Sequence, residues 1–118
     1  MLNVKGYAAL AVKQDLVPHS FVRRDPRDTD VVIDILYSGV CHSDIHSAFN
    51  DWGNATYPMV PGHEIIGKVS HVGSRVKGFS VGDYVGVGCM VDSCQHCAPC
   101  AKGLEQYCEA GPTMTYNS

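Results

Sequence analysis

No run of apolar residues in this sequence approaches the roughly 18 that a membrane-spanning helix needs. Basic residues are also scarce: nine Lys and Arg stand against twelve Asp and Glu, for a formal charge of −3, and they form no stripe. The N-terminal sequence MLNVKGYAALAVKQ has neither a long hydrophobic stretch nor a cleavage-type ending. We therefore expect a cytoplasmic protein that binds neither membranes nor nucleic acids.

Internal repeats, low-complexity tracts and linker-like stretches are also missing from the chain, so we expect one domain over its 118 residues. An apolar content of 45% with 18% charged residues is typical of globular proteins. Twelve glycines and six prolines interrupt the chain at short intervals, which favours strands and turns over long helices. The expected fold class is mainly β with short helices.

The expected elements are few and short. Apolar and β-branched runs predict strands at 31–39, 63–73 and 81–88. Residues 43–49 can form a short helix with Ser43 as its N-cap. The helix face expected to dock on a sheet carries Ile45, Ala48 and Phe49.

Four cysteines lie close together, separated by two, two and seven residues: Cys94, Cys97, Cys100 and Cys108. Zinc prefers a closed tetrahedron of such sulfurs where its role is structural. A bacterial iron–sulfur run would continue with a fourth Cys three residues on and then Pro, which does not occur here. Disulfides are disfavoured in a reducing compartment. We expect a structural-zinc lobe at about 89–112, with a cluster or disulfides as the open alternatives.

A second candidate metal site combines GVCHSDIH (39–46) with PGHEIIG (61–67). Cys41 follows one expected strand and His63 precedes another, so both would be held at strand ends. A catalytic zinc takes three protein ligands and keeps one position open, and these two residues would supply two of them. Asp44 would fix the tautomer of a ligand histidine, and Glu64 offers an oxygen next to His63.

These residues also allow other interpretations. A lone cysteine and a lone histidine are more often ordinary residues than ligands. His42 and His46 lie four apart on the expected helix, so with Cys41 they form an alternative chelating set. The HEIIG sequence begins like a metalloprotease motif, but Gly67 stands where the second histidine is needed, which excludes that class.

Taken together, the motifs resemble the zinc-dependent medium-chain alcohol dehydrogenases. GVCHSDIH, YPMVPGHEIIGKVSHVGSRVKGFSVGDYVGVG and the C-x2-C-x2-C-x7-C run occur in that family's order and spacing. The subgroup that they resemble is the cinnamyl-alcohol-dehydrogenase-like aldehyde reductases, which use NADP(H). The resemblance implies a GroES-like fold and an N-terminal catalytic domain over residues 1–118.

The resemblance also implies roles for individual residues. Cys41 and His63 would bind the catalytic zinc, with Glu64 able to exchange onto it. Ser43 would hydrogen-bond the substrate oxygen, and His46 would continue the proton relay. Asp44 would support His63 by accepting a hydrogen bond from its other ring nitrogen, Trp52 would lie in the substrate pocket or anchor the loop, and His42 would lie at the cofactor pyrophosphate. The structural zinc would be held by Cys94, Cys97, Cys100 and Cys108. Cys89 matches no ligand position and is expected to be buried.

Family members continue with further strands and a Rossmann domain, which supplies the NADP(H) site and the third ligand of the catalytic zinc. We therefore expect this chain to be a truncated domain that binds one tight zinc and reduces no aldehyde by itself. Exposed strand edges would let the fragment self-associate. The full-length enzyme is expected to be a homo-oligomer acting on small alcohols or aldehydes. The alternatives are a stand-alone zinc-binding structural or interaction module, a zinc ribbon, and a co-chaperonin-like subunit.

Overall fold

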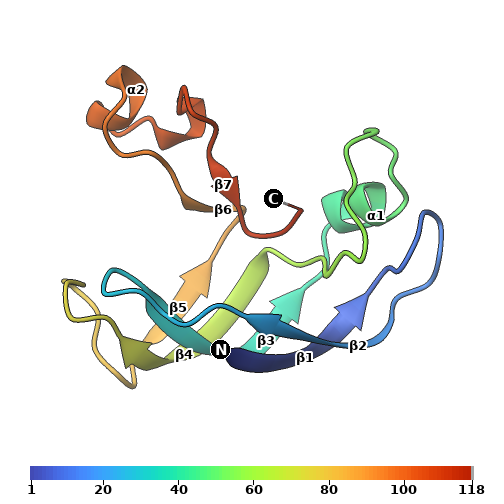
Figure 1. The fold of residues 1–118 in the computed structure, drawn as a ribbon, viewed down its shortest axis with the longest axis horizontal. Helices are drawn as coiled ribbons and strands as arrows, with labels where there is room; N and C mark the ends of the chain where they lie inside the picture. Colours follow the sequence, from blue (N-terminus) through green and yellow to red (C-terminus); the bar gives the residue numbers. More distant parts are fainter. Residues whose placement is uncertain (118) are drawn as a thin grey trace.

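The computed structural model describes residues 1–117, and within them the chain is mainly β with short helices, as predicted (Figure 1). Ser118 lies outside the described residues. The elements in chain order are β1 (Leu2–Ala8), β2 (Val17–Arg23), β3 (Val31–Gly39), α1 (His42–Ala48), β4 (Glu64–Val72), β5 (Tyr84–Val87), β6 (Met90–Asp92), α2 (Ala98–Ala101), the 3-10 helix η1 (Glu105–Tyr107) and β7 (Thr113–Met114).

The described strands form three antiparallel sheets, ordered β1-β2, β3-β4-β5 and β6-β7. Figure 1 shows that α1 and the segment with α2 rise from the same side of β1–β5, at opposite ends of it. The C-terminal residues run back between these two projections (Figure 1). The molecule therefore consists of a layer of strands, β1–β5, from which α1 projects at one end and the segment with α2 at the other.

The β3–β4 pair positions the candidate site. The predicted strand at 31–39 is confirmed residue for residue, while β4 and β5 are shorter than expected. In the antiparallel register Gly39 at the end of β3 pairs with Glu64 at the start of β4. Because the loops on either side begin at this pair, Cys41 and His63 are brought to the same edge of the sheet.

The β1–β2 hairpin was not predicted. Its sequences, LNVKGYA and VPHSFVR, mix polar residues, Gly and Pro with few apolar ones, so the alternation is weak. The hairpin joins the rest of the fold through a two-way backbone bridge: Ala9 N–H donates to Met59 O at 2.8 Å, and Met59 N–H donates to Ala9 O at 2.9 Å. Ala9 and Met59 are both buried there.

Helix α1 begins one residue earlier than predicted, and its cap is Cys41 instead of Ser43. The Cys41 backbone N–H donates to Asp44 Oδ2 at 2.8 Å, so the carboxylate reaches back over the first turn. The expected docking face is wrong in part: Ile45 is 46% and Phe49 40% exposed. The buried residues are Asp44, Ser47 and Ala48, and their hydrogen-bond partners are the side chains of His63, Tyr116 and Tyr57, which lie outside the strands.

The hydrophobic core is small for a chain of this length. Val69 is the one large side chain with under 2% exposure among the described residues. Apolar residues of β1 and β3, including Val4, Ile33 and Ile35, line an open hollow of about 780 Å³ between the two sheets. Much apolar surface is thus left uncovered, although no helix in residues 1–117 is long and apolar enough to cross a membrane.

Candidate metal centres

The four expected sulfur ligands converge in the segment between β6 and β7, residues 93–112, here called the cysteine lobe. Their sulfur atoms all lie within 4.8 Å of one another, in Cys94, Cys97, Cys100 and Cys108. Backbone N–H groups already point at two of the sulfurs: Cys97 N–H donates to Cys94 Sγ at 3.3 Å and Cys94 N–H to Cys108 Sγ at 3.4 Å. The loop therefore folds around the sulfurs and not around an apolar core.

The local sequence explains this convergence. Gln95 has a positive φ of 65°, which turns the chain between the first two cysteines. Pro99 stands in the first turn of α2, where its missing N–H is of no consequence, and its neighbour Cys100 is buried in that helix. Gly103, with φ of 72°, then ends the helix and returns the chain toward Cys108.

The thiols of the lobe differ in acidity. Donation of a hydrogen bond by the Ser93 hydroxyl favours ionisation of Cys100, but burial and the neighbouring Cys97 and Cys108 sulfurs oppose it and raise the pKa of Cys100 to about 11. The Cys94 backbone N–H lowers the pKa of Cys108. Without a cation the four sulfurs cannot all be thiolates at neutral pH, because their like charges repel. Four convergent sulfurs with N–H donors fit a structural zinc ion.

The second candidate site lies where β3 ends and β4 begins, at the Gly39–Glu64 pair. Cys41 Sγ, a ring nitrogen of His63 and a carboxylate oxygen of Glu64 all lie within 4.8 Å of one another. His63 is buried, at 6% exposure, whereas Cys41 is half-buried and Glu64 is exposed. We call these three residues the Cys41–His63 site. One sulfur, one nitrogen and one exchangeable oxygen fit the three-ligand set of a catalytic zinc.

The Asp44 carboxylate contacts both Cys41 and His63. Its Oδ1 lies 3.2 Å from His63 Nδ1, and its Oδ2 accepts the Cys41 backbone N–H at 2.8 Å. The carboxylate is 5% exposed, so both contacts are made away from solvent. A proton on Nδ1 is held by Asp44, which leaves the Nε2 lone pair of His63 free to face Cys41. One buried side chain thus orients both candidate ligands.

The thiol and the imidazole of this site are mutually polarised. Hydrogen bonds from Ser43, followed by that from His63, lower the pKa of Cys41. Burial disfavours the imidazolium of His63, but the hydrogen bond with Cys41 and the charge of Asp44 outweigh it and raise the pKa of His63. Both shifts favour a Cys41 thiolate facing a protonated His63 ring, so a metal ion would bind the thiolate as it is and would replace the proton on Nε2 of His63.

Glu64 reaches the site because Gly39 stands opposite it in the β3–β4 pair. A Cβ at Gly39 would collide with the Glu64 carboxylate, with the nearest atom being Oε2. The glycine therefore leaves the space that the carboxylate occupies beside Cys41 and His63. Sequence reasoning singled out Glu64 but not Gly39, whose role depends on the register of two strands.

The remaining predicted residues lie along α1 and the loop after it. Ser43 Oγ is 3.4 Å from His63 Nε2. His46 Nδ1 is 2.8 Å from Asp51 Oδ2, and its ring lies 5.4 Å from that of Trp52. His42 is exposed, with its ring 6.3 Å from that of His46. The structure therefore joins His46 to Asp51, a residue that the sequence analysis did not name.

Two further findings differ from the sequence analysis. Cys89, expected to be buried, is exposed. It lies in the link between β5 and β6, where the chain leaves the strand layer and runs toward the cysteine lobe (Figure 1). Tyr116, which was not singled out, stacks on His63 with ring centroids 5.6 Å apart. No local motif marks Tyr116, since it reaches His63 from 53 positions along the chain.

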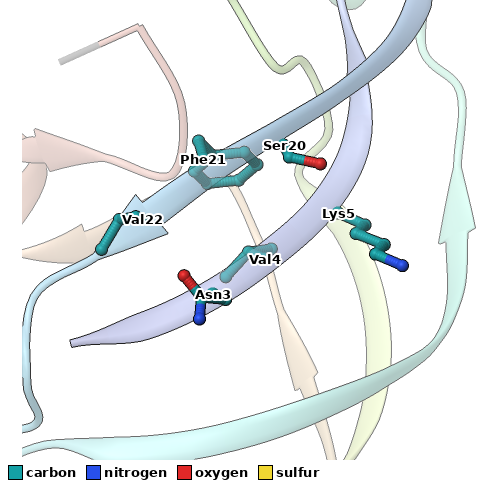
Figure 2. Close-up of a pocket in the computed structure, with 6 residues that line it drawn as sticks. All are labelled: Asn3, Val4, Lys5, Ser20, Phe21 and Val22. Atoms are coloured by element: carbon teal, nitrogen blue, oxygen red, sulfur yellow. The ribbon is translucent and has the colours of Figure 1, made fainter.

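Two surface hollows in the described part of the chain lie away from these centres. One hollow, of about 250 Å³, lies on the β1–β2 hairpin. Figure 2 shows the residues that line it: Asn3, Val4, Lys5, Ser20, Phe21 and Val22. That hollow and the larger one between β1 and β3–β4 include neither Cys41 nor His63. Convergent ligand atoms and shifted pKa values indicate a functional site better than an open apolar hollow does. We therefore place the candidate site at Cys41 and His63.

The sequence of this chain matches a known protein family and known relatives. Residues 27–116 match the profile of the alcohol dehydrogenase GroES-like domain. The chain is 52% identical over 118 residues to the NADP-dependent alcohol dehydrogenase C of Mycobacterium tuberculosis, covering 100% of this chain and 34% of that protein. The match thus spans about a third of the relative's length.

Solved structures give a similar result. A cinnamyl alcohol dehydrogenase from Sorghum bicolor superposes with a TM-score of 0.95 at 46% identity, covering 99% of this chain and 33% of that one. A cinnamyl alcohol dehydrogenase from Helicobacter pylori, complexed with NADP(H), superposes with a TM-score of 0.94 at 48% identity, covering 98% and 33%. The family resemblance and the GroES-like fold are therefore confirmed. This chain belongs to the alcohol dehydrogenase GroES-like domain family.

Proposed function

We propose that this chain is the zinc-binding N-terminal catalytic part of an NADP(H)-dependent alcohol dehydrogenase or aldehyde reductase. The observation that carries the proposal is the Cys41–His63 site, where three different ligand atoms lie within 4.8 Å of one another. A scaffold has no need of a half-buried thiol and a buried imidazole that share one orienting carboxylate. The NADP-dependent name of one relative and the NADP(H) complex of another support the cofactor choice.

The two centres would have different tasks. We assign Cys94, Cys97, Cys100 and Cys108 to a structural zinc, since all four positions of a tetrahedron are then protein sulfurs. We assign Cys41 and His63 to a catalytic zinc, with Glu64 as an exchangeable oxygen beside them. Asp44 holds the proton on His63 Nδ1, so that Nε2 stays available as a ligand.

In this proposal zinc supplies Lewis-acid polarisation of a carbonyl oxygen, and NADP(H) supplies the hydride. The Ser43 hydroxyl, 3.4 Å from His63 Nε2, stands at the site and would donate a hydrogen bond to the substrate oxygen. Movement of a proton between this oxygen and solvent needs a further titrating group.

That group is His46 on the solvent side of α1. Its Nδ1 is hydrogen-bonded to Asp51, which holds the ring with Nε2 available for proton transfer. We propose that His46 and Asp51 together form the outer part of the relay that begins at Ser43. Trp52, 58% exposed beside His46, would contribute an aromatic wall to the substrate pocket.

Domain organisation follows from the same proposal. We propose that residues 1–118 are the incomplete GroES-like domain of the enzyme, with the structural-zinc lobe at about 89–112. The chain spans about a third of the relatives' length, and in the family that it resembles the NADP(H) site lies in the Rossmann domain. Alone, the chain would therefore show no turnover of a primary alcohol or aldehyde. His42 stays a candidate for the cofactor pyrophosphate.

Metal analysis tests the proposal. After dialysis against a mild chelator, the chain is expected to retain about one zinc, in the cysteine lobe, because the Cys41–His63 site supplies few protein ligands. A titration with Co²⁺ should then produce thiolate–cobalt absorption that disappears in Cys41→Ser and in His63→Ala. Two zinc ions retained after dialysis would contradict the weak second site, and NADPH-dependent aldehyde reduction by this chain would contradict its inactivity.

The same titration separates the alternative function, a stand-alone zinc-binding structural or interaction module. Such a module needs the cysteine lobe but no second ion, so Co²⁺ would give no signal dependent on Cys41. The Asp44–His63 network is then without a purpose, which is why we prefer the dehydrogenase. Cytoplasmic location, homo-oligomer formation by the complete enzyme and self-association of this chain stay predictions.

A further inference from the structure

The three residues after β7 connect the cysteine lobe to the Cys41–His63 site. Thr115 fixes the start of this connection: its backbone N–H donates to Cys89 O at 2.9 Å, and its hydroxyl donates to Gly88 O. Both acceptors lie between β5 and β6, where the lobe leaves the strand layer. The chain is thus anchored at the base of the lobe before it turns toward α1 (Figure 1).

Tyr116 is the middle residue and makes two specific contacts. Its ring stacks on His63, with an interplanar angle of 21° and centroids 5.6 Å apart. Its hydroxyl lies 3.3 Å from Ser47 Oγ on the buried face of α1, where Ser47 is 4% exposed. The ring is therefore held between the candidate metal ligand and the helix that carries Asp44.

Asn117 is the third residue and joins the chain to the loop after α1. Its Oδ1 accepts the Thr56 backbone N–H at 2.9 Å, and its Nδ2 donates to Asn54 O at 3.2 Å. The residue has a positive φ of 58°, a conformation in which asparagine is better tolerated than most residues. Both partners follow Trp52 closely, so Asn117 fixes the loop that bears this aromatic side chain.

We propose that Thr115, Tyr116 and Asn117 form a strap through which the ordered cysteine lobe positions His63, with Tyr116 as the positioning residue. This inference rests on the proposed function, since it assigns His63 as a ligand. Asp44 holds one edge of the His63 ring, through Nδ1. The stacked tyrosine packs on the face of the ring and limits its tilting, so that Nε2 stays aimed at Cys41.

The strap gives the cysteine lobe a role in the chemistry of the other site. Folding of the lobe sets the path of β7, which pairs with β6, and thereby sets the position of Thr115. Release of the lobe sulfurs would free the strap and let the His63 ring turn. The two centres are therefore coupled by a short segment of chain, without any shared ligand.

NMR spectroscopy of the chain loaded with one equivalent of zinc tests the stack directly. Tyr116→Leu removes the ring, Tyr116→Phe keeps it and removes the hydroxyl, and Tyr84→Leu is a control on an exposed tyrosine of β5. In the unmodified chain we expect contacts between the two rings and an upfield displacement of His63 ring protons. Tyr116→Leu should lose the displacement, while Tyr116→Phe and the control retain it.

Cobalt titration of the same four proteins measures the consequence for the site. Co²⁺ should bind the Cys41–His63 site about 10-fold more weakly in Tyr116→Leu, in the range found for residues that orient metal ligands, and with unchanged affinity in Tyr116→Phe and Tyr84→Leu. Equal affinity in Tyr116→Leu and the unmodified chain would overturn the proposal. Zinc retained by the lobe serves as the folding check for each variant.

The coupling is tested with Cys108→Ser, which disrupts the lobe at a residue that is not part of the Cys41–His63 site. We expect the displaced His63 resonances to move toward their positions in Tyr116→Leu; unchanged resonances would overturn the coupling. Absence of any contact between the two rings in the unmodified chain would overturn the strap, even if Tyr116→Leu does not fold. Ring contacts without Co²⁺ binding would support the strap and refute the proposed function, so the two failures are distinguishable.

Discussion

The cysteine lobe and the Cys41–His63 site are both groups of metal-ligating side chains, but they are assembled differently. The four sulfurs of the lobe come from 15 consecutive positions, Cys94 to Cys108, and are buried or half-buried. Cys41 and His63 come from two loops that meet only because β3 and β4 pair. The lobe is a local structure that a metal would hold together, whereas the other site depends on the sheet around it.

The two regions also differ in how their ligands are supported. In the lobe the sulfurs mainly contact one another and nearby backbone N–H groups. At the Cys41–His63 site a buried carboxylate, a serine hydroxyl and a stacked tyrosine surround a single imidazole. A closed set of identical ligands suits a structural ion, and a mixed set with supporting residues suits a site where ligands must be oriented for chemistry.

The largest effect is expected from Cys100→Ser. This change removes a buried sulfur from the lobe, and a metal lobe with no apolar core of its own should lose its fold with the ion. Metal analysis should show loss of the one zinc retained after dialysis, together with proteolytic cleavage inside residues 93–112. Cys89→Ser is the matched control, an exposed cysteine outside the set, and should keep the zinc.

Asp44→Asn is expected to weaken metal binding at the Cys41–His63 site about 10- to 100-fold. The amide is a poorer acceptor for His63 Nδ1–H and for the Cys41 backbone N–H, so both ligands lose their orientation. Isothermal titration with Co²⁺ measures the change. Asp15→Asn, on an exposed loop, should bind normally, and zinc retention by the cysteine lobe should not change. Normal affinity in Asp44→Asn would remove the orienting role of this carboxylate.

The metal-free thiols should react at different rates. The pKa of Cys41 is lowered by hydrogen bonds from Ser43 and His63, whereas that of Cys100 is raised to about 11. At neutral pH Cys41 is therefore expected to be alkylated by iodoacetamide at least about tenfold faster than Cys100, even though a less basic thiolate is a weaker nucleophile. Peptide mass spectrometry over time gives both rates. Equal rates would show that the two environments do not differ electrostatically.

Gly39→Ala should destabilise the chain by about 1 kcal/mol, because the new Cβ collides with the Glu64 carboxylate and the pair must shift. Urea denaturation measures the free energy of unfolding. Gly88→Ala is the control: no heavy atom lies within 4 Å of where its Cβ would stand. If both variants unfold alike, the close packing of Gly39 against Glu64 is not important for stability.

The smallest effect is expected at the base of the lobe, where Arg27 lies 3.7 Å from Asp92 of β6 and also pairs with Asp30. The hydrogen bond from Arg24, followed by that from the Arg27 backbone, holds the pKa of Asp30 well below its usual value. A lowered pKa means that the stabilisation is present above the unfolded-state pKa of about 3.9 and is lost as pH falls through the folded-state pKa.

Asp30→Asn should therefore lower stability by at most about 1 kcal/mol at neutral pH and make the acid limb of the stability curve flatter. Thermal unfolding between about pH 7 and pH 2 measures both effects. Asp28→Asn, a neighbour that no ion pair in the described residues includes, is the control. A steeper acid limb in Asp30→Asn would contradict the direction of the shift.

Much of the fold was predictable from local patterns. The β-branched run at 31–39 is a strand to the residue, and the glycine and proline content anticipated a β-rich fold with short helices. The β1–β2 hairpin was not predicted because its residues show no clear alternation of apolar and polar side chains. The face of α1 was assigned incorrectly because Asp44 and Ser47 are buried by their roles at the site and not by hydrophobicity.

The cysteine spacing was sufficient to identify the lobe, since ligands a few positions apart are constrained by short loops alone. The Cys41–His63 pair could be suspected from its motifs, but its geometry needed the β3–β4 register. Contacts such as His63 with Tyr116, or Glu64 with Gly39, join positions whose spacing carries no signal. Local chain geometry is encoded in short stretches of residues, whereas the orientation of one imidazole is decided where several distant segments pack together.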